Sequence, residues 1–145
     1  MPSRKIEDLH PDLQIIAKEF IRRCDEEIKD AEVRIICTHR SDEEQTADYA
    51  KGRTVNSGIN VSDKRPLGAT VTNAKAGQSK HNNTENGKPA SRAFDIGVFI
   101  NGVYDKYGKS TSWGKAGKIG MELNLNWFGA KGSKFFELAH FQLKG

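Results

Sequence analysis

Residues 92–106 carry the sequence "RAFDIGVFINGVYDK", in which a short apolar run ends at the dipeptide Asn101-Gly102. The run from 92 to 100 predicts a buried strand, because it is short, apolar and rich in β-branched and aromatic residues. Asn-Gly between two such runs is the strongest short signal for a β-hairpin. We therefore expect residues 103–106 to return as a second strand beside the first.

The two faces of the predicted strand differ in chemistry. A period of two places its large apolar side chains on one face, which we expect to be packed: Phe94, Ile96 and Val98. Asp95 points to the other face, where its neighbours Ala93 and Gly97 are very small. Such neighbours leave room beside the carboxylate for an ion or a ligand, so Asp95 is the first candidate site residue.

The rest of the chain supplies helices and further strands. Apolar residues at helical spacing predict a helix over about 11–29, and a capping box of Ser41 and Glu44 predicts another over 42–51. The other predicted segments are a third helix over 111–123, a long loop over 52–80, and strands over 32–38, 125–129 and 135–143. This pattern predicts an α+β fold, a small mixed or antiparallel sheet with two or three helices.

Composition limits the classes of function. The 145 residues suit a single domain spanning 1–145, and 36% hydrophobic residues suffice for one core. The net charge of +4 favours anionic partners, with wall polymer or lipopolysaccharide as a secondary hypothesis. Basic residues form no run of four, so we expect no nucleic-acid partner. No apolar stretch reaches the roughly 18 residues of a membrane span. We expect a monomer without stable membrane insertion. Cys24 and Cys37 are expected to be buried free thiols.

Two histidines and a glutamate complete a candidate metal site with Asp95. His81 lies in a polar segment upstream of the strand, and His140 lies in the last predicted strand. Two imidazoles and one carboxylate suit a catalytic zinc site that keeps a fourth position open. Glu137 could then accept a proton, although a straight strand would point Glu137 and His140 to opposite faces, so the chain must bend between them. Spacing alone leaves a structural His–Asp hydrogen bond open as the alternative.

Several segments resemble one family in the same order along the chain. "SKH…SRAFD" followed by "ELAH" resembles the Ser-x-His…Ala-x-Asp…Glu-x-x-His pattern of the zinc D-Ala-D-Ala metallopeptidase family, and within it the L-alanyl-D-glutamate endopeptidases of phage endolysins. "HPDLQIIAKEF" (10–20) is similar to the first helix of those endolysins. "CTHRSDEEQ" (37–45) is similar to their strand followed by Arg and Gln.

The resemblance implies a fold and a set of roles. The fold would be a small hedgehog/DD-peptidase-like α+β domain with zinc on the sheet. The implied roles are zinc ligation by His81, Asp95 and His140, general base catalysis by Glu137, oxyanion stabilisation by Arg40, and substrate contact or support by Ser79. Gln45, close to Arg40, is a further candidate for substrate binding, although a surface position on the helix is equally open. Arg40 could instead be an ion-pair partner of Asp42 or Glu44, and Glu137 could be a solvated edge residue.

The expected function is therefore zinc-dependent hydrolysis of the L-Ala–D-Glu bond in the peptidoglycan stem peptide, by an enzyme of phage or prophage origin. The N-terminus lacks the apolar segment of a secretory signal, so we expect the host cytoplasm as its location until a holin-type pore releases it. The alternatives are a D,D-carboxypeptidase or dipeptidase on D-Ala-D-Ala, and a non-catalytic wall- or polyanion-binding module with a structural zinc. The chain departs from the family in the long His81–Asp95 gap and in Ala139, where a proline is frequent.

Overall fold

The computed structural model describes residues 2–131 and 137–145, and it confirms the α+β class. The described helices are α1 (Pro11–Glu27), α2 (Asp42–Ala50) and α3 (Ser112–Glu122), with short 3-10 turns η1 (Ile6–Asp8) and η2 (Lys80–Asn82). The described strands are β1 (Glu32–Cys37), β2 (Thr84–Glu85), β3 (Lys88–Pro89), β4 (Ala93–Ile100), β5 (Val103–Tyr104), β6 (Leu125–Trp127) and β7 (His140–Leu143).

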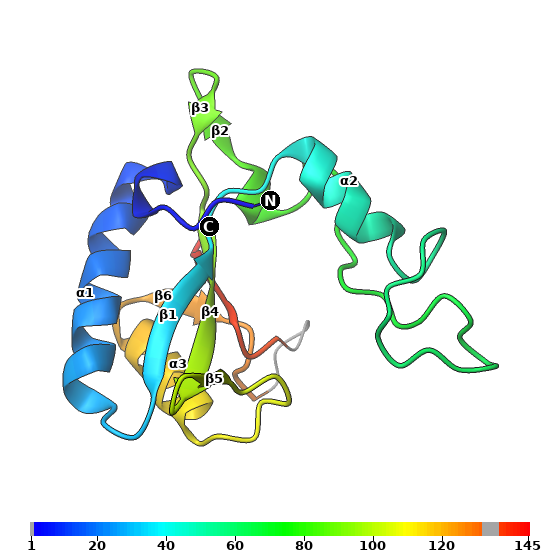
Figure 1. Cartoon of the computed structure of the whole chain (residues 1–145). Coiled ribbons are helices and arrows are strands. Elements are labelled where there is room, and N and C mark those ends of the chain that lie inside the picture. Colours follow the sequence, from blue (N-terminus) through cyan, green and yellow to red (C-terminus); the bar gives the residue numbers. More distant parts are fainter. Residues whose placement is uncertain (1, 132–136) are drawn as a thin grey trace.

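The main sheet is antiparallel and runs in the order β1-β4-β7-β6, with β5 pairing with the end of β4 (Figure 1). β4 therefore lies in the middle of the sheet, as its apolar sequence predicts. The register aligns Asp95 with Cys37 on β1 and with His140 on β7. One row across three strands thus holds a thiol, a carboxylate and an imidazole.

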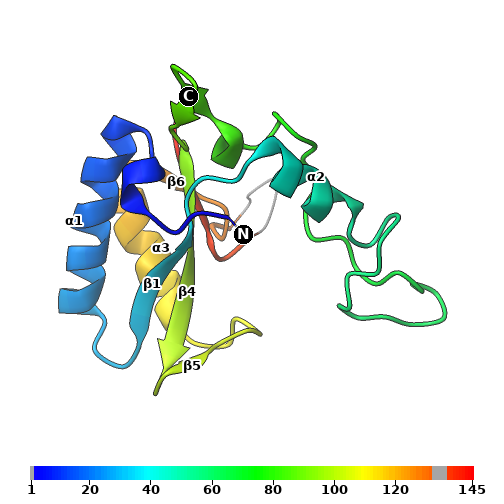
Figure 2. The same ribbon diagram turned by 45° about the horizontal axis from the view of Figure 1, so that its top comes forward.

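Helices α1 and α3 cover one face of the sheet, while α2 lies on the other side (Figures 1 and 2). The predicted packed face of β4 is confirmed, because Phe94, Ile96 and Val98 are fully buried in the core. The rings of Phe20, Phe94 and Phe141 pack with centroids 5.0–5.4 Å apart. Asp95 consequently faces away from α1 and α3, toward the side that carries α2 and η2.

The predicted hairpin after β4 is confirmed, with Asn101 and Gly102 both at positive φ, but its returning strand is Val103–Tyr104 and shorter than the predicted 103–106. The same dipeptide occurs at Asn86-Gly87 and closes a small β2–β3 hairpin, which the sequence analysis treated as loop. The last predicted strand, over 135–143, begins later than expected. Residues 135 and 136 lie outside the described residues, and the strand starts only at His140, after a turn.

Helix α2 begins with the predicted capping box. Ser41 Oγ accepts from the Glu44 amide at 3.1 Å, and a Glu44 carboxylate oxygen accepts from the Ser41 amide at 2.9 Å. After α2, residues 51–78 form a long arm that is held by turns and projects away from the sheet (Figures 1 and 2). No helix within the described part of the chain is long and apolar enough to cross a bilayer.

Two glycines of α3 give a matched test of the packing. A Cβ at Gly120 would overlap the ring of Phe141, whereas a Cβ at Gly114 would meet no atom within 4 Å. We expect Gly120→Ala to destabilise the protein by about 1–3 kcal/mol, because overpacking outweighs the helix preference for alanine. Gly114→Ala is expected to stabilise it by about 0.5–1 kcal/mol. Urea denaturation of both variants checks the two opposite signs, and a stabilised Gly120→Ala variant would contradict the packing of β7 against α3.

Candidate metal centre

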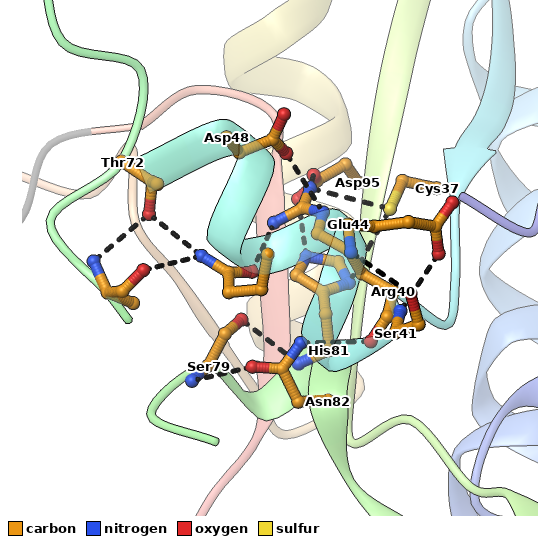
Figure 3. Close-up of polar contacts among 12 residues, drawn as sticks. Cys37, Arg40, Ser41, Glu44, Asp48, Thr72, Ser79, His81, Asn82 and Asp95 are labelled. Atoms are coloured by element: carbon orange, nitrogen blue, oxygen red, sulfur yellow. Dashed lines mark hydrogen bonds and ion pairs between the residues drawn. The ribbon is translucent and has the colours of Figure 1, made fainter. Parts of the chain in front are cut away.

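The candidate site lies on the open face of the sheet, where His81 from η2 meets the row that Asp95 occupies (Figure 3). His81 Nε2 lies 3.2 Å from Asp95 Oδ1, and His140 Nδ1 lies 3.1 Å from the same oxygen. Both imidazoles are buried, and their ring centroids are 5.1 Å apart. The structure therefore brings the three predicted ligand side chains together around one carboxylate oxygen.

In each imidazole, the nitrogen that points away from Asp95 (the outer nitrogen) has a hydrogen-bond acceptor of its own. The carbonyl oxygen of Thr38 lies 2.7 Å from His81 Nδ1, and Gln142 Oε1 lies 2.9 Å from His140 Nε2. Because these oxygens accept hydrogen bonds, they favour the tautomers that carry hydrogen on the outer nitrogens. The inner nitrogens, His81 Nε2 and His140 Nδ1, then present lone pairs toward Asp95. Metal-ligating histidines are commonly oriented in this way by a second acceptor.

Three facing lone pairs repel one another unless a cation or a proton lies between them, so this donor set fits a metal ion. In the metal-free protein, a proton on one of these nitrogens would relieve the same repulsion, in agreement with the raised pKa of His81. Burial alone would lower the pKa of His81, but the charge of Asp95 and its hydrogen bond outweigh burial and raise the pKa to about 10. Burial likewise opposes ionisation of Asp95, yet the adjacent His81 and His140 hold its pKa well below its usual range.

Among the described residues, the side chains whose ligand atoms lie close enough together to hold one metal ion include Cys37 and not His140. Ligand atoms of Cys37, His81 and Asp95 all lie within 4.8 Å of one another, so these three residues form a group that could hold a metal ion. Cys37 Sγ lies 3.8 Å from His81 Nδ1, the ring nitrogen that also faces Thr38. Cys37 is a buried free thiol, as predicted. Its place beside His81 was not predicted from the sequence.

Arg40 lies at the edge of the site and makes several polar contacts. Its guanidinium lies 3.7 Å from Asp95 Oδ2 and 3.3 Å from Asp48 Oδ2, and Nη1 donates to Gln45 Oε1 at 3.0 Å. Within the described residues, the acidic partner of Arg40 on α2 is Asp48 and not Asp42, while a Glu44 carboxylate oxygen accepts from the Ser41 amide. Arg40 therefore reaches the same space as the candidate ligands.

Gln45 lies behind Arg40 and not in the cavity. Its side chain is fully buried, and Nε2 donates to the Ala74 carbonyl at 2.6 Å. Gln45 thus connects Arg40, through hydrogen bonds, to Ala74 in the part of the arm that leads back toward η2. This position explains why a glutamine in the middle of α2 is shielded from solvent, and it favours a supporting role over direct substrate contact.

Ser79 and Asn82 fix the short turn that carries His81. Ser79 Oγ accepts from the His81 amide at 3.2 Å, and Asn82 Oδ1 accepts from the Ser79 amide at 3.3 Å. Asn82 Nδ2 donates to the Arg40 carbonyl at 2.9 Å. Asn82 was missed in the sequence analysis, although Ser79-x-x-Asn82 has the spacing of a capping pair, and it joins the His81 and Arg40 segments.

Glu137 reaches the site through the turn that precedes β7. The His140 amide donates to the Glu137 carbonyl at 3.4 Å, so the chain bends between the two residues as the sequence required. Glu137 is exposed and lines a cavity of about 440 Å³. Although the residue as a whole is exposed, partial loss of water around its carboxyl raises the pKa of Glu137; His140 opposes this effect and Asp95 adds to it. The other residues that line this cavity are Arg40, Val71, Thr72, Asn73, Ala74, Gln78, Ser79, Lys80, His81, Asp95, Phe128, His140 and Gln142.

The stability of the metal-free protein is expected to depend on pH through His81. Its pKa is about 6.5 when unfolded and about 10 when folded, so its contribution is full below pH 6.5 and is lost as the pH rises toward 10. The free energy of unfolding should therefore fall from pH 6.5 to 8.5, and His81→Gln should flatten that slope. Urea denaturation with a chelator present measures both. The range stops at 8.5 because burial raises the pKa of Cys24 to about 12, and its ionisation in the unfolded chain above pH 9 adds a second slope.

Comparison with known proteins assigns no family to the chain. Neither the models of protein families nor the curated proteins include a match to it. The site is therefore defined by its own geometry: two imidazoles on one carboxylate oxygen, with an arginine, a glutamate and a thiol beside them.

Proposed function

We propose that the protein is a zinc-dependent peptidoglycan endopeptidase that cuts the stem peptide between L-Ala and D-Glu. One observation carries this proposal: His81 and His140 direct their inner nitrogens at Asp95 Oδ1, in a cavity that Glu137 and Arg40 also line. Two nitrogens and a carboxylate oxygen form the ligand set of many catalytic zinc sites. A site with only a structural purpose would have no use for a glutamate and an arginine at its open side.

We favour His140 over Cys37 as the third ligand. Cys37 faces His81 Nδ1, which the Thr38 carbonyl already engages at 2.7 Å, whereas Asp95 faces Nε2. A single ion cannot use both nitrogens of one imidazole. The set of His81, Asp95 and His140 keeps both outer nitrogens hydrogen-bonded, which is the arrangement expected around zinc.

Each group at the cavity would have its own role in the proposed reaction. Zinc, when bound, would polarise the scissile carbonyl and lower the pKa of water to about 7. Glu137 lines the same cavity and would accept the proton of the attacking water, and its raised pKa suits the later return of that proton to the leaving amine. Arg40 lines the same cavity, and its guanidinium would stabilise the negative charge that develops on the carbonyl oxygen, a contribution of about 3–4 kcal/mol for such donors.

The cavity also suits an acidic peptide. The cationic residues Arg40 and Lys80 line it, with Lys80 Nζ donating to the Gly145 carbonyl oxygen at 2.8 Å. Phe128 gives the cavity an apolar wall against His140, with ring centroids 4.3 Å apart. Residues 71–74 of the arm also line the cavity. A stem peptide, with small alanine side chains next to a D-Glu carboxylate, has the size and charge that such a cleft accepts.

Mass spectrometry of the products from purified peptidoglycan tests the proposal. We expect stem peptides with a new D-Glu amino terminus, abolished by a zinc chelator and restored by added zinc. Release of free D-Ala would instead establish a carboxypeptidase. The absence of any cleavage by the zinc-loaded protein would leave a binding module and overturn the endopeptidase assignment.

A further inference from the structure

The arm of residues 51–78 supplies one part of the cavity wall. Residues 71–74 line the cavity in one consecutive stretch, although most of the arm projects away from the sheet (Figures 1 and 2). We call residues 71–74 the arm wall. They belong to no helix or strand, and none of the four is buried. The position of the arm wall therefore depends on the side chains that hold its backbone.

Arg53, near the start of the arm, holds the arm wall at Thr72 and Asn73. Its Nη1 donates to the Thr72 carbonyl oxygen at 3.0 Å and to the Tyr49 carbonyl oxygen of α2 at 2.7 Å. Nη2 donates to Asn73 Oδ1 at 3.5 Å, and the guanidinium carbon lies 3.8 Å from the centroid of the Tyr49 ring. A guanidinium is planar and its donors have a fixed geometry, so Arg53 joins α2 to the arm wall in one arrangement.

Gln45 holds the other end of the arm wall, and it differs from Arg53 in its second contact. Gln45 Nε2 donates to the Ala74 carbonyl oxygen at 2.6 Å, while Oε1 accepts from Arg40 Nη1 at 3.0 Å. Within the described residues, the polar contacts of the Arg53 side chain are all with Tyr49 and the arm wall. Arg53 does not itself line the cavity. It therefore acts on the cavity only through the arm wall.

We propose that Arg53 is a positioning residue for substrate: it keeps the arm wall in place, so that the stem peptide binds to a cavity that is already formed. This inference rests on the proposed peptidase function. When a binding surface is formed in only a fraction of the molecules, the apparent affinity falls by that fraction. Because the contacts of Arg53 include neither Glu137 nor Arg40, its loss should weaken substrate binding without slowing the chemical step.

Steady-state hydrolysis of a purified stem peptide by the zinc-loaded protein tests this role. We expect Arg53→Gln to raise KM by about tenfold, since a hydrogen bond from a charged donor contributes about that factor or more. The kcat should stay within about twofold of the wild-type value, and the zinc content should not change. Arg53→Lys keeps the charge but not the planar fork, so its KM should also rise, by about threefold or more. A wild-type KM in Arg53→Lys would show that charge alone matters and would overturn the positioning role.

Arg65→Gln provides the matched control. Arg65 is an exposed arginine of the same arm, and among the described residues its side chain makes no hydrogen bond to the arm wall. The same change of charge at this position should leave KM at the wild-type value. An equal rise in KM would assign the effect to the charge of the arm and overturn the inference. A lower kcat or a loss of zinc in Arg53→Gln, with KM unchanged, would overturn it as well.

Amide hydrogen exchange measures the order of the arm wall without any need for hydrolysis. The Ala74 amide donates to Thr72 Oγ1 at 3.1 Å, so its exchange reports on opening of this stretch. We expect exchange at Ala74 to be about tenfold faster in Arg53→Gln and unchanged in Arg65→Gln. Unchanged exchange in Arg53→Gln would overturn the inference even if the protein hydrolyses the peptide. If the wild-type protein hydrolyses no stem peptide, the proposed function fails, while faster exchange would still establish that Arg53 holds the arm wall.

Discussion

Glu137→Gln is expected to reduce hydrolysis of peptidoglycan by about 10²–10⁴-fold while zinc remains bound. General acid–base groups contribute accelerations of this size, and the amide keeps the shape of the carboxylate but accepts no proton. Glu137 lines the cavity, and the residue does not belong to the group around Asp95 Oδ1. Its loss should therefore affect the rate of cleavage and not the amount of metal. The rate of peptide release and the zinc content of the purified variant measure the two effects separately.

Glu43→Gln provides the matched control, because Glu43 is an exposed residue of α2 and does not line the cavity. The same change of charge there should leave both the rate and the zinc content unchanged. Digestion by Glu137→Gln at a rate near that of the wild type would show that Glu137 is not the base. Loss of zinc from this variant would instead show that Glu137 is a ligand.

The elements that position Asp95 could be predicted because their signals are local. Asn101-Gly102 fixes the turn after β4, and the alternation of apolar and small residues fixes which face Asp95 occupies. The capping box of Ser41 and Glu44 sets the start of α2 in the same way. Each of these signals depends on residues only a few positions apart, and tertiary packing did not override them.

The contacts between residues far apart in the sequence could not be predicted from such local signals. The position of Cys37 opposite Asp95 depends on a register shift between Ile35 and Cys37, which follows from how β1 pairs with β4. Similarly, Gln45 is buried because residues 72–74 return over α2 from the far end of the arm. The spacing of polar residues along the chain contains no information about such a return. Sequence patterns thus placed Asp95 and His140 on strands, while the position of His81 in η2 and the partners of these three side chains came only from the fold.

His81→Ala is expected to lower zinc affinity by more than about 100-fold and to abolish hydrolysis. Loss of an outer partner alone typically costs about 10–100-fold in affinity, so loss of a ligand should cost more. Zinc content after dialysis and peptide release measure the two effects. Urea denaturation of the variant is needed beside them, because Asp95 loses one of the two imidazoles that stabilise its charge.

A comparison of His140→Ala with Cys37→Ala then decides the third ligand. Both side chains lie beside His81 or Asp95, but only His140 directs a nitrogen at Asp95 Oδ1, at 3.1 Å, and has its other nitrogen hydrogen-bonded to Gln142. We therefore expect His140→Ala to lose zinc as His81→Ala does, and Cys37→Ala to keep it with activity within a few fold of wild type. The reverse result would assign the metal to Cys37, His81 and Asp95. Cys37 lies on β1 and is not among the residues that line the cavity of Glu137, so a thiolate ligand would favour a structural role for the metal over the peptidase mechanism.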